Sequence, residues 1–216
     1  GVIRFQFESF LKPGDRFLYS NAGYMIAGAV LERATGRAWQ QMMRTDLFVP
    51  LGMTTAGFGA PGRDKHVDQP WGHLKAERGS KPMFADNPPS LGPAGTVHAT
   101  LEDWAGFVAL HLGVGQEAKK PVVSKELLAK LQQPPKDAEY ASGWVVTKRD
   151  WAPGPVIWHN GSNTMWYAIT WMAPELQFAV LVTCNHGESI VFTIRMTASA
   201  VRPIPQWFSS PRVTPH

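Results

Sequence analysis

Residues 166–183, WYAITWMAPELQFAVLVT, decide the fold class of this chain. Two runs rich in Val, Ile, Trp, Tyr and Thr, 166–172 and 177–183, flank the turn residues 173–176. Such residues favour pleated, half-buried strands, so the stretch predicts an antiparallel hairpin. Two further runs of the same kind, 140–147 and 156–159, precede it. The C-terminal part of the chain is therefore predicted to form consecutive antiparallel strands.

The segment upstream of this sheet has helical patterns. Ala22–Thr35 is rich in Ala, Met, Ile and Leu, follows the cap-forming residue Ser20, and stops at Gly36. A second helix is predicted over Ala38–Phe48 and is closed by Pro50. The short link between the two helices predicts a helical hairpin.

The remaining segments complete an α+β arrangement, with helices first and an antiparallel sheet last. Residues 56–93 are crowded with Gly, Pro, Asp and Lys, which predicts a long excursion with at most short strands. Further helices are predicted after the caps Thr100 and Ser124, over residues 101–112 and 125–131, and a closing helix over 189–201 is predicted to cover the sheet. Residues 1–135 thus form a mostly helical region, and residues 136–216 form the sheet region.

Composition excludes several classes of function. The chain has 216 residues, 44% of them hydrophobic and 18% charged, which predicts a folded domain. Its net charge of +4 comes from scattered basic residues, so no nucleic-acid partner is expected. No apolar run is long enough to cross a membrane. The seven dispersed histidines predict no metal site, and no nucleotide-binding motif predicts a cofactor.

A first candidate site is the triplet Tyr19-Ser20-Asn21 at the start of a helix. A phenol works as an acid or base near neutral pH only where positive charge lowers its pKa from about 10. The helix N-terminus supplies part of that charge, and a Lys alongside would supply more. Asn21 offers a donor and an acceptor to an amide substrate. The structural alternative is a packed aromatic residue whose hydroxyl lies in water.

A second candidate site is Trp158-His159-Asn160-Gly161, followed by Ser162, at the end of a predicted strand. A hydrogen-bonding side chain on a strand, with a glycine two residues later, suits recognition of a substrate carboxylate. The alternative is a structural histidine within the sheet. Tryptophans near these strands suit an apolar acyl group or, equally, sheet packing.

The order of these motifs resembles that of the penicillin-recognising serine hydrolases: class C β-lactamases, D-alanyl-D-alanine carboxypeptidases and esterase relatives. Tyr-Ser-Asn opening a helix, Phe48–Met53, Gly92–Gly95 ahead of a helix with Asp103, and His-Asn-Gly on a strand carry the resemblance. It implies a β-lactamase/transpeptidase-like fold, of which this chain would hold an incomplete portion.

The resemblance also implies roles for individual residues. Tyr19 would be the general base or proton relay, and Asn21 would bind the substrate amide. His159 and Gly161 would form the third motif of the family, and Ser162 would lie beside the substrate carboxylate.

The family's nucleophile is a serine in Ser-x-x-Lys at a helix N-terminus. The one match here, Ser9-Phe10-Leu11-Lys12, runs straight into Pro13-Gly14 and lies only ten residues before Tyr19, so we reject it. The nucleophile is therefore expected in an N-terminal segment outside this chain, which is expected to be inactive alone. Cleavage with continued association of that segment, or a degenerate relative, are the alternatives.

The expected function is hydrolysis of an amide, ester or β-lactam carbonyl through an acyl-enzyme. A histidine in place of lysine in the third motif favours carboxypeptidase or esterase activity over β-lactamase activity. The alternative is a non-catalytic relative that binds peptidoglycan or protein. Expected partners are a small-molecule or peptide substrate and the missing N-terminal segment; a periplasmic or extracellular location would require a signal peptide in that segment.

Overall fold

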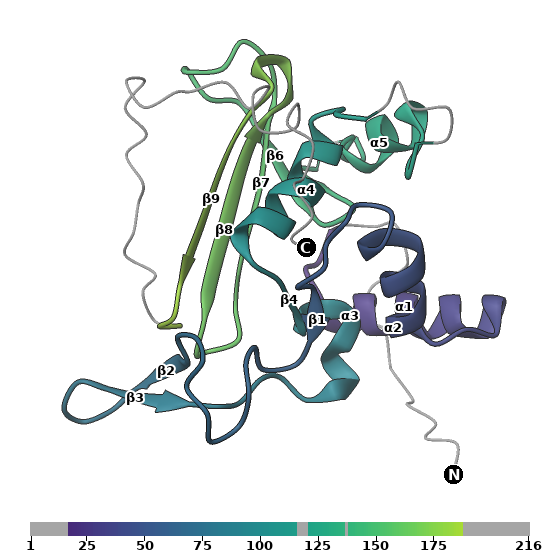
Figure 1. Ribbon diagram of the computed structural model, residues 1–216. Helices are drawn as coiled ribbons and strands as arrows, with labels where there is room; N and C mark the ends of the chain where they lie inside the picture. Colours follow the sequence, from purple (N-terminus) through teal and green to yellow (C-terminus); the bar gives the residue numbers. More distant parts are fainter. Residues whose placement is uncertain (1–16, 116–120, 137, 188–216) are drawn as a thin grey trace, which may run out of the picture.

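A five-stranded antiparallel sheet, in the order β5-β6-β7-β8-β9, dominates the fold, with helices on one of its faces (Figure 1). The computed structural model describes residues 17–115, 121–136 and 138–187. The helices are α1 (Asn21–Thr35), α2 (Trp39–Met42), the π-helical η1 (Met43–Phe48), the 3-10 turn η2 (Pro89–Leu91), α3 (Gly92–Gly95), α4 (Leu101–His111), α5 (Lys125–Leu131) and the 3-10 turn η3 (Pro174–Leu176). The strands are β1 (Gly57–Phe58), β2 (Gly72–Lys75), β3 (Ser80–Met83), β4 (Val97–His98), β5 (Tyr140–Ala141), β6 (Trp144–Thr147), β7 (Val156–Ser162), β8 (Tyr167–Ala173) and β9 (Phe178–Cys184).

Three helices begin where their capping residues predict. The hydroxyl oxygens of Ser20, Thr100 and Ser124 each accept a backbone N–H from the first turn of α1, α4 and α5 respectively. Helix α1 ends at Gly36, whose φ of 67° is left-handed and whose N–H donates to the carbonyl of Glu32. Local capping chemistry therefore sets these boundaries.

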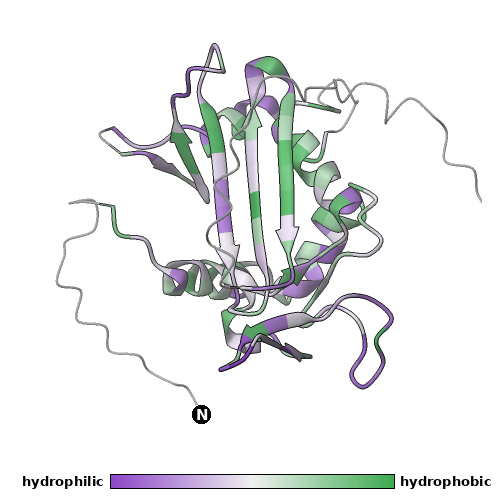
Figure 2. Cartoon of the chain, turned by 90° about the vertical axis from the view of Figure 1, so that its left-hand side faces the viewer, coloured by the Kyte–Doolittle hydropathy of each residue, from purple (hydrophilic) through white to green (hydrophobic). Residues whose placement is uncertain are grey.

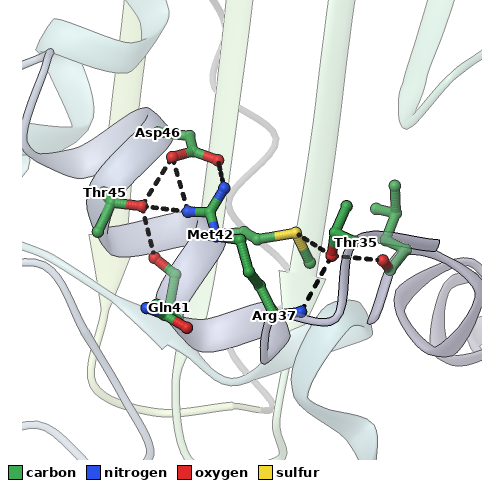
Figure 3. A network of polar contacts seen from close by, with 7 residues as sticks. Thr35, Arg37, Gln41, Met42, Thr45 and Asp46 are labelled. Atoms are coloured by element: carbon green, nitrogen blue, oxygen red, sulfur yellow. Dashed lines mark hydrogen bonds and ion pairs between the residues drawn. The ribbon is translucent and has the colours of Figure 1, made fainter. Parts of the chain in front are cut away.

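The second predicted helix spans the expected residues but changes register, because α2 continues directly as the π-helical η1. Figure 3 shows the polar network that ties this pair of helices to the end of α1. The guanidinium of Arg37 donates to both carboxylate oxygens of Asp46 at 2.8 Å, and also to the hydroxyl of Thr45. This bidentate ion pair closes the predicted helical hairpin on its exposed side.

Two predictions about the strands are wrong. A single strand over residues 140–147 is broken by a turn at Ser142-Gly143, both with positive φ, so that β5 and β6 form a tight hairpin. Strand β7 also extends three residues beyond the predicted end, to Ser162. His159 therefore lies within a strand, paired with Thr170 of β8. The predicted hairpin of β8 and β9 is confirmed.

Alternation along the strands separates two faces of the sheet. On one face, the buried residues Ile157 and Met172 pack against Val108 and Leu112 at the C-terminal end of α4. On the opposite face, onto which Figure 2 looks, the rings of Trp158 and Trp171 stack in register, with centroids 4.7 Å apart. His159 shares the face of Ile157, which is the face turned toward the helices.

Helix α1 is held against the short helix α3 by a close approach at Gly28. A Cβ atom at Gly28 would lie 2.5 Å from Cγ of Pro93, so only a glycine fits there without movement. Beside it, Gly92 lies against the ring of the buried Trp39. The excursion over residues 56–93 contains three short strands, β1 to β3, as predicted.

Some predicted features lie outside the described residues, among them the closing helix over 189–201 and the rejected Ser9–Lys12 motif. No helix in the described part of the chain combines the length and apolar character needed to cross a bilayer.

Candidate active site

The triplet Tyr19-Ser20-Asn21 lies at the N-terminal end of α1. Tyr19 lies two residues before the helix and is 52% exposed, and Asn21 is the first helical residue. The Tyr19 hydroxyl donates to Oδ1 of Asn21 at 3.3 Å. Ser20 between them caps the helix, so its backbone geometry directs both neighbouring side chains to the same end of α1. The phenol and the amide therefore sit at a helix N-terminus, where partial positive charge gathers.

His159 of β7 lies next to Tyr19 on the side of the sheet that faces the helices. The imidazole of His159 stacks beside the ring of Tyr19, with centroids 6.1 Å apart and planes 29° from parallel. Residues 140 positions apart in the sequence are thus neighbours at one site. The structure brings Tyr19, Asn21 and His159 together as a phenol, an amide and an imidazole.

A third aromatic residue, Tyr140 of β5, completes the group and was not identified from the sequence. Its hydroxyl lies 3.1 Å from Nε2 of His159. Its ring meets those of Tyr19 and His159 edge to face, each at 5.8 Å, and stacks on Phe17 at 4.8 Å. The Ser142-Gly143 turn is the sequence signal that would have placed Tyr140 on a separate edge strand.

Burial shifts the titration of two of these groups. It raises the pKa of the Tyr140 phenol, and the neighbouring hydroxyls of Tyr24 and Tyr19 raise it further. It lowers the pKa of the His159 imidazole, an effect that the backbone of Asn160 partly opposes. Near neutral pH the site therefore presents a protonated phenol beside a neutral imidazole.

The C-terminal end of β7 is more exposed to solvent than its middle. Gly161 is exposed, and a Cβ atom built there would meet nothing within 4 Å, so the strand is open on this side. The hydroxyl of Ser162 donates to the carbonyl of Gly187 at 3.2 Å and accepts the N–H of Thr164 at 3.0 Å. Ser162 therefore already holds two partners within the protein, which fix the turn after β7.

That turn is also where the long excursion docks. Nδ2 of Asn163 donates to Asp86 at 2.7 Å, while its Oδ1 accepts the N–H of Trp166 at 2.8 Å. On the same end of the sheet, His73 of β2 bonds through its ring Nδ1 to the carbonyl of Asn185 at 3.0 Å. Residues from the excursion therefore border the open end of β7, beside Gly161.

A cavity of about 400 Å³ adjoins the tyrosines. Phe17, Tyr19, Tyr24 and Tyr140 form much of its wall, and the other lining residues are apolar or neutral and polar, Gln133 among them. Its lining includes no Asp, Glu, Lys or Arg. Within the described residues no cluster of histidine, cysteine or carboxylate side chains could hold a metal ion. The chemistry available here is hydrogen bonding and proton transfer beside an uncharged, aromatic pocket.

The family model described as Beta-lactamase matches residues 6–200 and so includes every residue of this site. The chain belongs to the beta-lactamase family. This confirms the resemblance to penicillin-recognising serine hydrolases and the β-lactamase/transpeptidase-like fold class that the motifs predict.

Individual relatives within this family are distant. Penicillin-binding protein 4 of Amycolatopsis lactamdurans is 25% identical over 193 residues, which cover 83% of this chain and 50% of that protein. Protein flp of Staphylococcus aureus is 23% identical over 184 residues, covering 83% of this chain and 35% of the relative. The chain therefore spans about a third to a half of the length of these curated relatives.

Solved structures give the same fold. The octameric penicillin-binding protein homologue from Pyrococcus abyssi superposes with a TM-score of 0.67 at 24% identity, covering 82% of this chain and 40% of that one. D-amino acid amidase from Ochrobactrum anthropi SV3, in a complex with L-phenylalanine amide, superposes with a TM-score of 0.63 at 20% identity, covering 80% of this chain and 50% of that one. These likenesses establish the fold.

Proposed function

We propose that the protein hydrolyses an ester or amide carbonyl through an acyl-enzyme, with Tyr19 as the proton relay. The observation that carries this proposal is the convergence of the Tyr19 phenol and the His159 imidazole at the N-terminal end of α1. Membership in the beta-lactamase family supports it independently.

The proposed steps conserve atoms and charge. A serine Oγ attacks the carbonyl carbon while its proton passes to the Tyr19 oxygen, and the leaving group departs with a proton from the same phenol. Water then attacks the acyl-enzyme by the reverse route and releases the acid. Because Oδ1 of Asn21 accepts from Tyr19, its Nδ2 is the group that would donate to a substrate carbonyl.

We place the nucleophilic serine in sequence outside these 216 residues. The single Ser-x-x-Lys of the sequence, at Ser9, is followed directly by Pro13-Gly14, a pattern that does not predict the long helix on which the family carries its serine. The chain also spans only 35% to 50% of the length of the two curated relatives named above, which leaves room for such a segment in a complete protein.

The third motif favours substrates without a free carboxylate. Burial lowers the pKa of His159, so this residue supplies no fixed cation for an anionic group, and the adjoining cavity is lined by uncharged residues. Gly161 leaves the strand open for a substrate backbone, and Ser162 stands at the far end. We therefore expect esters and neutral amides to be better substrates than β-lactams.

The test is intact-mass spectrometry after incubation with a penicillin and, separately, with an activated aryl ester. The complete protein should gain the mass of an acyl group, and the 216-residue chain alone should not. Tyr19→Phe in the complete protein should slow acylation by about 10²–10⁴-fold, the usual contribution of general acid–base catalysis. Tyr167→Phe, on the outer face of the sheet, is the matched control and should acylate at the normal rate.

Two results would contradict the proposal. An adduct on the isolated chain would place the nucleophile within these residues. A complete protein that forms no adduct and turns over no ester, yet binds peptidoglycan fragments by calorimetry, would be a binding relative rather than a hydrolase.

A further inference from the structure

A second cavity, of about 380 Å³, lies between α4, α5 and the turn that follows β5. It is lined by Phe107 and Leu110 of α4, Leu128 of α5 and Trp144 of β6, among other apolar residues. Leu110, Leu128 and Trp144 are buried, so the cavity reaches into the core. An engineered apolar cavity of about 150 Å³ already binds benzene. A substituted benzene therefore fits in this larger space.

This cavity is separate from the one beside Tyr19. The turn at Ser142-Gly143 lies between them: Ser142 lines both cavities, and their other lining residues differ. A Cβ atom at Gly143 would lie 3.3 Å from the hydroxyl of Tyr24, so α1 packs closely against this turn. The cavity therefore lies outside the site proposed for hydrolysis, and what it binds does not depend on that function.

One polar ring, that of His111, is buried in the wall of this apolar cavity. His111 is 7% exposed, and its imidazole meets the rings of Phe107 and Trp144 edge to face, with centroids 4.9 Å and 5.0 Å apart. Burial lowers its pKa to about 4, so the ring is neutral near neutral pH. A buried neutral imidazole requires a hydrogen-bond partner at each of its two nitrogens.

The side chain of Gln132 serves one of these nitrogens. Its Nε2 donates to the carbonyl of His111 at 2.7 Å, which identifies this end of the amide as the nitrogen. The same Nε2 lies 3.5 Å from Nδ1 of the ring. Because an amide nitrogen only donates, Nδ1 faces it as an acceptor, and the proton of the neutral ring belongs on Nε2. In the described part of the chain, no residue accepts a hydrogen bond from Nε2 of His111.

We propose that this cavity binds a small, uncharged, largely apolar molecule with one hydrogen-bond-accepting oxygen, such as an aryl ketone, and that Nε2–H of His111 donates to that oxygen. The apolar walls favour burial of a hydrocarbon group. Among the described residues, no Asp, Glu, Lys or Arg lines the cavity, which disfavours an ionic ligand. The acceptor oxygen supplies the partner that the buried imidazole lacks.

The experiment is a titration of the ¹⁵N-labelled 216-residue chain at about pH 7 with two probes of the same shape. Acetophenone carries a carbonyl oxygen, and α-methylstyrene has a methylene group in its place. Both probes should give saturable shifts of the backbone amides of α4 and α5. In His111→Phe, the affinity for acetophenone relative to that for α-methylstyrene should fall about two- to tenfold, the usual contribution of one hydrogen bond.

A second pair of variants tests the location. Val123→Phe places a larger side chain in the wall of the cavity, at a partly exposed residue that can adjust, and should weaken both probes at least about tenfold. Val67→Phe is the matched control, because Val67 is 74% exposed in the excursion and does not line the cavity. This control should leave both affinities unchanged.

The wild-type chain provides a readout that does not depend on the folding of His111→Phe. The ring ¹⁵N signals of His111, identified by nuclear Overhauser contacts to the indole of Trp144, should shift with acetophenone at Nε2 and stay in place with α-methylstyrene.

Three results would overturn the proposal. The first is the absence of saturable shifts in α4 and α5 up to the solubility limit of the probes. The second is binding that Val123→Phe does not weaken, which would assign the probes to the cavity beside Tyr19 or to the surface. The third is an Nε2 signal of His111 that responds equally to both probes, or a ratio of affinities that His111→Phe leaves unchanged.

Discussion

The contact between α1 and α3 can be tested by one substitution made at two positions in the same helix. Gly28 is buried, and a Cβ atom there would lie 2.5 Å from Cγ and 3.2 Å from Cβ of Pro93. Gly23 is exposed, and its nearest neighbour would be Cβ of Ser20 at 3.9 Å, an ordinary contact. Because Asn21 begins α1 and Tyr19 lies two residues before it, this contact helps to position half of the site.

The two alanine variants should change stability in opposite directions. Each gains about 1 kcal/mol of helix propensity over glycine. At Gly28 the proline ring cannot rotate away, so overpacking should cost about 2–3 kcal/mol, the upper part of its usual range. The net expectation is a loss of about 1–2 kcal/mol for Gly28→Ala and a gain of up to about 1 kcal/mol for Gly23→Ala.

The assay is urea unfolding followed by the fluorescence of the nine tryptophans, with thermal unfolding as a second measurement. A difference of about 2–3 kcal/mol between the variants corresponds to at least about 4 °C in Tm for a chain of this size. If both substitutions raise stability equally, Pro93 does not pack on Gly28 in solution, and the placement of α1 must be revised.

Two further predictions concern pH. Hydrogen bonds from Arg37 and Thr45 lower the pKa of Asp46 to about 2, below its unfolded value. The ion pair therefore stabilises the fold above pH 4 and loses this effect as pH falls from about 4 to 2. Thermal unfolding of wild type and Asp46→Asn across this range should show their Tm difference shrinking toward zero. Burial lowers the pKa of His111 to about 4, below its unfolded value near 6.5, so the neutral ring favours folding above pH 6.5 and stability falls as pH drops from 6.5 to 4. The loss should amount to no more than about 3 kcal/mol in urea unfolding, and His111→Phe should remove most of this slope, whereas an unchanged slope would assign it to other groups.

Features that depend on local chemistry were predictable from the sequence. The hydroxyls of Ser20, Thr100 and Ser124 cap helices at the expected residues, because a capping side chain acts within one helical turn. The hairpin of β8 and β9 follows from two strand-forming runs beside a turn. The motifs around Tyr19 and His159 were recognised by residue type and order, and the structure brings them together.

Features that depend on tertiary contacts were not predictable in the same way. The π-helical register of η1 carries no local signal that distinguishes it from an ordinary α-helix. Strand β7 extends past His159 because β8 pairs with it as far as Ser162, and such pairing is a property of the partner strand. Tyr140 was missed because its importance comes from a hydrogen bond to a residue 19 positions away.

The charge balance of the site connects these observations. Near neutral pH the Tyr140 phenol and the His159 imidazole are neutral, and the adjoining cavity is lined by uncharged residues. A phenol that relays protons needs nearby positive charge, of which the N-terminus of α1 provides only a part. In the proposed function, the remaining charge must come from the segment that carries the nucleophile, where the family places its lysine. The described residues would then bind the substrate and relay the proton, and the added segment would supply the nucleophile and the positive charge that the Tyr19 phenol needs. Binding of a neutral substrate should therefore persist in the 216-residue chain, whereas turnover should require the complete protein.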